Sequence, residues 1–384
     1  RKNKIKEKRV EKKRMENMKK KFFLKKSYVR DEVNVFFTNF FLCFFKKKIK
    51  NPQKIIVKMT DGLGDIVIRS KLIEKIIEKY GYENVFFLVR EEYNFLGKAL
   101  EFPIITISRK ERYNLIRRIK KMYQINKIGI KKFINLEWSN DDLIRNIYSK
   151  EKLGIEALEE EDKKNNKCYT KSLKLRTKKI FNEEEKNIID FLKEIAIFLF
   201  DKSIEKEELI PNLKDKFYTS FCNEGIVIGV GATDKNRVCN PYKMSEYIKA
   251  MASICPEEKI YLVGGGKSQE IYSKKIIELC SNENIVNLVN KTNLQSVLEI
   301  VAKAKIFIGF DSGLYNFRYT LRKKQIALFR SKKVPYVHNE KFTKILEGKK
   351  ENLNEVKDEK YSNLEINNIN IDEFEKSFIE LLNL

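Results

Sequence analysis

The sequence has little of what imidazole catalysis and metal sites require. Its 384 residues contain one histidine, His338, and six cysteines that form no CxxC pair. A site that needs two histidines is excluded, and a Ser–His–Asp triad would depend on His338 alone. Such scattered cysteines argue against a structural zinc site and a disulfide framework, and they are typical of a reducing compartment. We therefore expect chemistry based on carboxylates, cationic side chains and backbone amides, without a metal or cofactor.

The chain also lacks an apolar run of the roughly 20 residues that span a bilayer. Charge, in contrast, is abundant: 79 Lys and Arg against 54 Asp and Glu leave a net charge of +25. Such a charge is typical of proteins that bind nucleic acid, an anionic membrane or a phosphorylated substrate. We find no RRM, KH or helix-turn-helix signature, so we expect no nucleic-acid partner.

The first 50 residues differ from the rest. Residues 1–30 hold fifteen basic and three acidic residues, and a phenylalanine-rich stretch with pairs at 36/37, 40/41 and 44/45 follows. A spacing of four places these rings on one face of a helix, and Lys46, Lys47 and Lys48 close the stretch. One interpretation is a helix lying in an anionic membrane interface. The alternative is a helix packed on the domain behind it.

From Lys54 onward, short apolar strands alternate with helical segments in two successive series, which predicts two doubly wound parallel sheets. The predicted strands are 55–59, 85–89, 104–107 and 132–136, then 225–230, 259–263, 285–288, 306–310 and 325–329. Segment 154–178 is predicted to be a polar loop. We therefore expect an extension (1–50), a first domain (51–215) and a second domain (216–384), whose last helix, 371–382, is a candidate to pack back on the first domain.

The turn after the first strand reads Lys58-Met-Thr-Asp-Gly-Leu-Gly-Asp65. Ligands of open α/β sheets collect at the carboxyl ends of strands. The turn matches neither a dinucleotide fingerprint nor a P-loop. Asp65 is a candidate general base, and Asp61, Gly62 and Gly64 belong to the same loop. The alternative is that Asp65 only caps the following helix.

Three further strand ends carry candidate residues. In Gly229–Arg237, amides with Thr233, Lys235 and Arg237 suit a phosphate or diphosphate, although an ordinary polar loop has the same composition. A glycine turn and a strand end carry the remaining candidates, which are Gly265, Gln269, Glu270, Asp311, Ser312, Gly313 and Asn316.

Together and in this order, these segments resemble glycosyltransferase family 9, the ADP-heptose:lipopolysaccharide heptosyltransferases. The similarity runs through Leu63-Gly-Asp65, Gly231-Ala-Thr233 with Arg237, Leu262-Val-Gly-Gly265 and Ile306–Gly313. It covers about residues 53–345. Asn316 stands where the family usually has histidine, and Val-Cys-Asn-Pro replaces its Trp-Pro.

The resemblance implies a GT-B fold of two Rossmann-like domains facing a cleft. It implies inverting, metal-independent transfer of a sugar, with heptose as one candidate, from a nucleotide-sugar to a lipopolysaccharide, lipooligosaccharide or other lipid-linked glycan. Asp65 would be the base. The donor diphosphate would meet Thr233 and Arg237, the ribose Gln269 or Glu270, and the donor sugar and phosphates Asp311, Ser312 and Gly313. We expect a cytoplasmic protein, peripheral on the inner face of the membrane; a non-catalytic GT-B-like binding protein is the alternative.

Overall fold

The computed structural model describes residues 29–44, 51–137, 142–156, 176–179, 187–214, 216–217, 225–330, 340–348 and 365–384. His338, residues 1–28 and 45–50 and most of the predicted polar loop lie outside these ranges. Contacts divide the chain into two units. The first comprises Arg1–Thr60, Tyr80–Asn94 and Phe102–Phe181, and the second comprises Asp61–Lys79, Phe95–Glu101 and Asn182–Leu384. The predicted domain boundary at residues 215/216 does not coincide with this division and stays a prediction.

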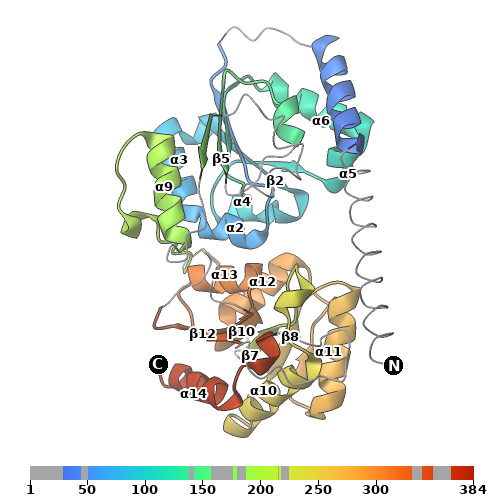
Figure 1. Ribbon diagram of the computed structural model, residues 1–384, viewed down its shortest axis with the longest axis vertical. Helices are drawn as coiled ribbons and strands as arrows, with labels where there is room; N and C mark the ends of the chain where they lie inside the picture. The colour runs from blue at the N-terminus through green and yellow to red at the C-terminus, as the bar shows by residue number, and fades with distance from the viewer. Residues whose placement is uncertain are drawn as a thin grey trace, which may run out of the picture. The chain divides into compact units, whose positions relative to one another are not determined.

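The first unit is built on a parallel sheet of six strands in the order β3-β2-β1-β4-β5-β6 (Figure 1). Its strands are β1 (Lys54–Lys58), β2 (Val85–Arg90), β3 (Ile104–Ile107), β4 (Ile130–Asn135), β5 (Glu151–Glu156) and β6 (Arg176–Lys179). The central strand β1 is an unbroken apolar run between its end residues, because helices or loops cover both faces of a parallel sheet. The predicted loop at 154–178 is wrong at both ends, where β5 and β6 form. Their sequences, EKLGIE and RTKK, mix charge with few apolar residues and so give no strand pattern.

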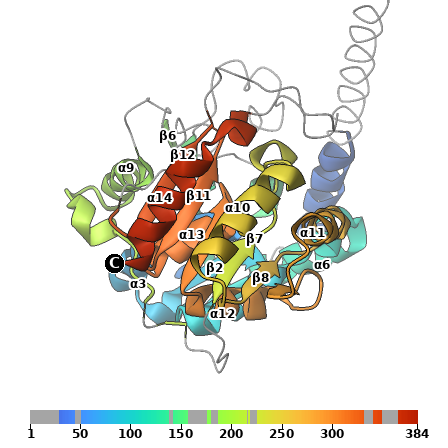
Figure 2. The same ribbon diagram turned by 90° about the horizontal axis from the view of Figure 1, so that it is seen from below.

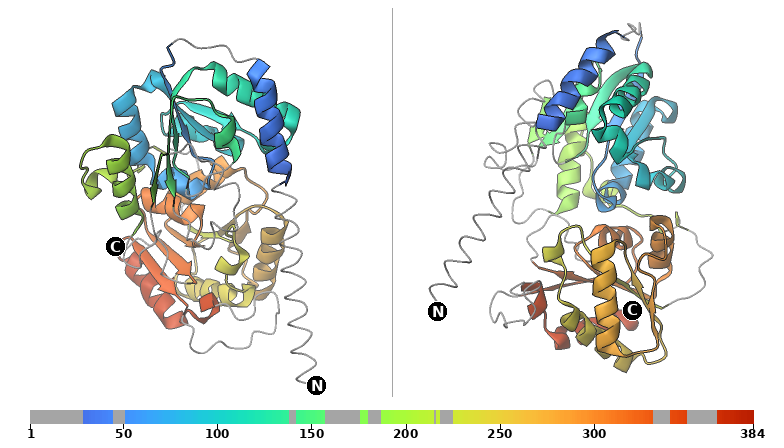
Figure 3. Two further views of the ribbon diagram at one scale, coloured as in Figure 1. Left: turned by 45° about the horizontal axis from the view of Figure 1, so that its top comes forward. Right: turned by 90° about the vertical axis from the view of Figure 1, so that its right-hand side faces the viewer.

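The helices of this unit include α5 (Arg109–Tyr113), α6 (Leu115–Lys127) and an amino-terminal helix over residues 29–44. Figure 3 shows the amino-terminal helix beside α6. Leu42 of that helix joins Met122 and Ile125 of α6 in one buried cluster with Leu88 and Phe133 of the sheet. Short 3-10 turns, η1 (Tyr82–Asn84), η2 (Glu91–Tyr93) and η3 (Asp142–Asn146), complete the unit.

The second unit contains another six-stranded parallel sheet, in the order β12-β11-β10-β7-β8-β9. Its strands are β7 (Ile226–Gly229), β8 (Ile260–Val263), β9 (Ile285–Asn287), β10 (Ile306–Phe310), β11 (Gln325–Phe329) and β12 (Thr343–Glu347). Four of the five predicted strands are buried along their whole length, as their apolar sequences require. Strand β12 was not predicted, because it is an edge strand whose sequence TKILE mixes polar and apolar residues.

The helices of the second unit follow the predicted alternation, with α10 (Pro241–Ile254), α11 (Lys267–Cys280), α12 (Leu294–Lys303) and α13 (Gly313–Thr320). It also includes α2 (Leu63–Ile68), α3 (Ser70–Tyr80, whose last residue falls in the first unit), α4 (Phe95–Ala99), α9 (Ile188–Phe200), η4 (Lys206–Leu209), η5 (Lys235–Arg237) and η6 (Glu365–Asn368). No helix in the described ranges is both long and apolar enough to cross a membrane.

The last helix, α14 (Ile371–Leu382), packs against α10, β11 and β12 (Figure 2). Its residues Phe374, Phe378 and Leu381 are buried in the same cluster as the apolar side chains of β7, β8, β10 and β11. The suggestion that this helix packs back on the first domain is therefore corrected, because its apolar face is used within the second unit.

Arg318 of α13 is a fully buried cation inside the second unit. Its guanidinium donates hydrogen bonds to the carbonyl oxygens of Val301, Ala302 and Ala304 at the end of α12. Helix carbonyls at a carboxyl end carry partial negative charge and need donors. Burial lowers the pKa of Arg318 to about 9, and the side chain fixes α13 to α12.

Candidate active site

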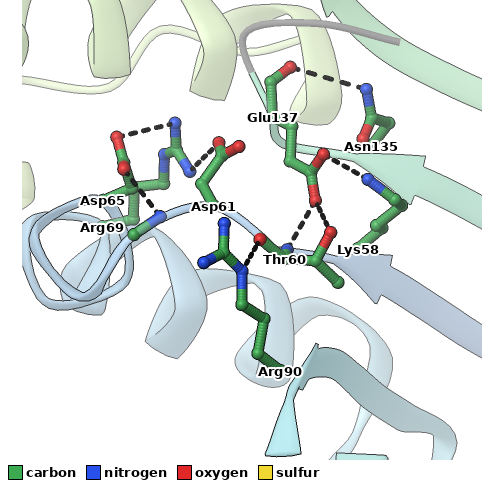
Figure 4. A network of polar contacts seen from close by, with 9 residues as sticks. Lys58, Thr60, Asp61, Asp65, Arg69, Arg90, Asn135 and Glu137 are labelled. Carbon is green, nitrogen blue, oxygen red and sulfur yellow. Dashed lines mark hydrogen bonds and ion pairs between the residues drawn. The ribbon is translucent and has the colours of Figure 1, made fainter. Parts of the chain in front are cut away.

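A buried ion pair supports the carboxyl end of β1 (Figure 4). The ammonium of Lys58 contacts Glu137, which follows β4, and the two side chains are 0% and 5% exposed. The same carboxylate accepts hydrogen bonds from the backbone N–H of Thr60, at 2.5 Å, and from its hydroxyl. Arg90 donates from Nε to the Thr60 carbonyl oxygen, 2.5 Å away. Because a buried charge is costly unless it is paired, this network fixes Thr60 at the end of β1.

The predicted loop continues from Thr60 into α2. Gly62 is the N-cap of this helix, and the Asp65 carboxylate accepts a hydrogen bond from the Gly62 backbone N–H at 3.1 Å. Asp65 therefore does cap the helix, as the alternative interpretation holds, where the helix dipole favours a negative charge. About a fifth of its side chain is still exposed, so the cap leaves the carboxylate accessible.

Arg69 lies one helical turn after Asp65. Its side chain is completely buried, with Nη1 3.5 Å from Oδ2 of Asp61 and Nη2 3.8 Å from Oδ1 of Asp65. Both carboxylates of the predicted loop thus share one rigid cation. Arg69 was not among the predicted residues, although its i+4 spacing from Asp65 is a helical signal for such a pair.

The start of α2 packs directly on the start of α13. A Cβ atom at Gly64 would lie 2.8 Å from Nδ2 of Asn316, and one at Gly313 would lie 3.2 Å from the Gly64 backbone nitrogen. Only glycine allows the two backbones to approach so closely. The predicted residues Gly64, Gly313 and Asn316 are therefore brought together, and Asn316 is buried at this contact.

Asp311, at the end of β10, is the second carboxylate of this region. Burial raises its pKa from the ordinary 3.8; the neighbouring Arg237 guanidinium opposes this, and the nearby charge of Asp65 adds to it. Nη1 of Arg237 lies 2.9 Å from Oδ2 of Asp311, and the Arg237 side chain is 47% exposed. Asp65, Asp311 and Arg237 thus lie near one another, and of the three Asp311 is buried whereas Asp65 and Arg237 are partly exposed to solvent.

The loops after β7 and β8 carry predicted donor-binding residues, and their glycine turns meet at Gln269. A Cβ at Gly231 or Gly264 would lie 2.3 Å or 2.2 Å from the Gln269 side chain, so both glycines make room for it. Its Oε1 accepts a hydrogen bond from the Gly265 backbone N–H at 2.9 Å. Gln269 therefore joins the loops that follow β7 and β8.

Glu270 has other partners. It forms an ion pair with Lys274 at 2.8 Å and accepts a hydrogen bond from Asn290 at 3.1 Å, and these contacts lower its pKa. The Asn290 Oδ1 in turn accepts from the Gly266 backbone N–H at 2.7 Å. Asn290 was missed, because nothing in its own segment indicates a contact with the turn that follows β8.

The other predicted donor residues are placed less specifically. Thr233 and Lys235 are exposed on the loop after β7, and Ser312 is the N-cap of α13 without a side-chain capping bond. Within the described ranges, no group of three His, Cys, Asp or Glu side chains is arranged to hold a metal ion.

The fold and these strand-end loops define an α/β protein of the GT-B type. The solved structure titled "E. coli heptosyltransferase WaaC with ADP-2-deoxy-2-fluoro heptose" matches with a TM-score of 0.60 at 13% identity, covering 85% of this chain and 99% of that one. This match confirms the predicted α/β fold with two parallel sheets.

The sequence of the second unit matches a known family. Residues 214–370 match the family model "Glycosyltransferase family 9 (heptosyltransferase)". A lipopolysaccharide heptosyltransferase 1 of Campylobacter coli is 27% identical over 125 residues, which is 32% of this chain and 36% of that protein. A lipooligosaccharide heptosyltransferase 2 of Campylobacter jejuni (strain 81116) is 21% identical over 288 residues, 72% of this chain and 81% of that protein. The predicted resemblance and the predicted class, a glycosyltransferase, are confirmed.

Proposed function

We propose that the protein transfers a sugar, with inversion and without a metal, from a nucleotide-sugar to a lipid-linked glycan. The observation that carries this proposal is the group of Asp65, Asp311 and Arg237, in which the Asp65 carboxylate and the Arg237 guanidinium are partly exposed beside the buried Asp311. The family 9 match supports a nucleotide-sugar donor. The names of the Campylobacter relatives support heptose and a lipopolysaccharide or lipooligosaccharide acceptor, and the E. coli neighbour holds an ADP-heptose analogue.

Asp65 is the proposed base. Its carboxylate takes the proton from the acceptor hydroxyl while the hydroxyl oxygen forms a bond to the anomeric carbon. The bond from that carbon to the diphosphate oxygen breaks, and its electron pair leaves with the nucleoside diphosphate. One displacement inverts the anomeric centre. Gly62 and Arg69 hold the carboxylate in place through the contacts described above.

Arg237 is the proposed partner of the leaving diphosphate. In this structure it pairs with Asp311, while about half of its side chain stays exposed. Developing negative charge on the leaving group is stabilised by a preorganised cation and by backbone amides. The amides after β7, with Thr233 and Lys235, are the proposed additional donors, and Asp311 holds Arg237 in place between turnovers.

The first test is binding and turnover of ADP-heptose. We expect ADP-heptose to raise the thermal unfolding midpoint, because a ligand that binds only the folded state stabilises it. With a lipid A-linked acceptor we expect release of ADP, unchanged in the presence of EDTA, and a product of inverted anomeric configuration by NMR. Stabilisation by ADP-heptose without turnover on any lipid-linked acceptor would instead support the non-catalytic binding protein.

The second test replaces the base. Asp65→Ala should lower kcat by about 10²- to 10⁴-fold, the usual contribution of a positioned base. The matched control is Asp372→Asn, which alters another aspartate in the first turn of a helix of the same unit, α14. Both variants should unfold within a few degrees of the parent. An Asp65→Ala enzyme that keeps its kcat would refute the assigned role.

A further inference from the structure

The amino-terminal helix has two faces of opposite character. Asn34, Val35, Thr38 and Leu42 are buried at 5% exposure or less. The other face carries five phenylalanines between 40% and 72% exposed. These residues, which we name the phenylalanine face, are Phe36, Phe37, Phe40, Phe41 and Phe44. Isolated exposed apolar side chains are common, but a contiguous patch of large ones marks a binding surface.

The buried face packs on the first unit, beside whose helices Figure 3 shows the amino-terminal helix. Asn146 donates from Nδ2 to the Val35 carbonyl oxygen at 3.2 Å and to Oδ1 of Asn39 at 2.9 Å. Asn34 donates to the Tyr113 carbonyl oxygen at 3.2 Å. Buried polar groups that are paired in this way specify one orientation of the helix. The two interpretations of this segment are therefore compatible, because one face packs on the domain while the other stays open.

The rings of the phenylalanine face contact one another. Phe36 and Phe37 lie edge to face with centroids 5.3 Å apart, and Phe40 stands in the same relation to Phe41 and Phe44 at 5.6 Å and 5.1 Å. The helix thus presents a preassembled aromatic surface.

The helices on which the amino-terminal helix packs are rich in positive charge. Helices α5 and α6 contact the amino-terminal helix, since the Arg30 guanidinium lies 4.4 Å from the Tyr113 ring centroid and Leu42 packs with Met122. Together these two helices contain eight basic residues and one acidic residue, Glu111. Five of the basic residues are exposed, namely Arg109, Lys110, Arg117, Lys120 and Lys127. In the sequence, residues 1–30, which end in the first turn of the helix, add twelve net positive charges.

We propose that the phenylalanine face inserts into an anionic lipid surface while the basic residues of α5 and α6 contact the headgroups. This inference rests on the proposed function for one point only, the lipid-linked nature of the acceptor. Aromatic insertion combined with basic side chains is the usual chemistry of interfacial helices. A second copy of the chain is the less favourable occupant, because pairing two such surfaces would bring two strongly basic regions together.

The test is sedimentation of the full chain with vesicles, without donor or acceptor. The vesicles contain phosphatidylglycerol and phosphatidylcholine in equal parts, or phosphatidylcholine alone. We expect binding to the anionic vesicles, weakened by salt. The triple variant Phe36→Ser, Phe40→Ser, Phe44→Ser should lower the partition coefficient at least about 100-fold, because three large apolar side chains no longer leave water.

The matched control removes exposed apolar side chains elsewhere, with Tyr82→Ser, Ile271→Ser and Ile379→Ser, which are 54%, 53% and 43% exposed. It should bind anionic vesicles like the parent. Thermal unfolding midpoints of both variants show whether each is folded. The proposal is overturned if a folded phenylalanine variant binds like the parent, if the control loses as much binding, or if both vesicle types bind equally. It is also overturned if the parent is a dimer that binds no vesicles and only the phenylalanine variant is monomeric.

Transfer to a detergent-dispersed acceptor separates this proposal from the proposed function. We expect the phenylalanine variant to keep the parent's rate there, where no vesicle is needed. If the protein transfers no sugar but its vesicle binding depends on the phenylalanines, the lipid-binding role of the phenylalanine face stands. Only the proposed function is then refuted.

Discussion

Two polar networks follow one another along the chain at the end of β1, and they differ in one property. In the Lys58–Glu137–Thr60 network, both charged side chains are 5% exposed or less and are paired with each other. In the Asp61–Arg69–Asp65 network, the cation is buried but each carboxylate is about a fifth exposed. A closed network can only support the backbone, whereas an open one can accept a proton from a substrate. The Lys58–Glu137–Thr60 network therefore supports the loop, whereas the Asp61–Arg69–Asp65 network holds the carboxylates that a substrate can reach.

The largest effect is expected from breaking the closed network. Lys58→Met leaves the Glu137 charge buried without its cation and should lower the free energy of unfolding by about 3–5 kcal/mol. Adding Glu137→Gln removes that charge while keeping an acceptor for Thr60, so the double variant should recover part of the loss. Urea unfolding measures both. The control is Lys132→Met, which removes the partner of the half-exposed Glu151 and should cost less than about 1 kcal/mol. Equal losses at Lys58 and Lys132 would contradict the distinction.

Breaking the open network should affect rate more than stability. Arg69→Gln takes away the cation between Asp61 and Asp65, and kcat should fall about 10- to 100-fold because the base is less well positioned. The KM for the nucleotide-sugar should stay within about twofold. Arg69→Lys, which keeps the charge, should restore part of kcat. A rise in KM with kcat unchanged would show that Arg69 serves donor binding instead.

The smallest effect concerns Asp311, whose pKa burial raises. The folded state therefore holds this proton more tightly than the unfolded chain does. The stability that this preference contributes is fully present below the ordinary pKa of 3.8 and is lost as the pH rises through the raised value. Relative to Asp311→Asn, the parent should thus lose free energy of unfolding as the pH rises through this range. Urea titrations of both proteins at several pH values measure the difference, and a change of opposite sign would mean that the Arg237 ion pair dominates.

The sequence predicted most of the fold, because the central strands β1, β7, β8, β10 and β11 are apolar runs without interruption. It did not predict β5, β6 and β12, whose mixed sequences show no period. Asp65, Asp311 and Arg237 were predicted from strand ends, where parallel sheets present their loops. Glu137 and Asn290 were not, because their roles arise from contacts between segments far apart in the chain, and no local pattern reports such contacts.

The packing of the amino-terminal helix determines what a truncation would do to the first unit. Because Leu42 and Val35 are part of the core of the first unit, deleting residues 1–50 would uncover Met122, Ile125 and Phe133 as well as removing the aromatic surface. A shortened protein that aggregates or sediments would therefore report a damaged core, whatever its affinity for lipid. Point changes on the phenylalanine face avoid that confusion, because they leave Val35 and Leu42 in place in the core.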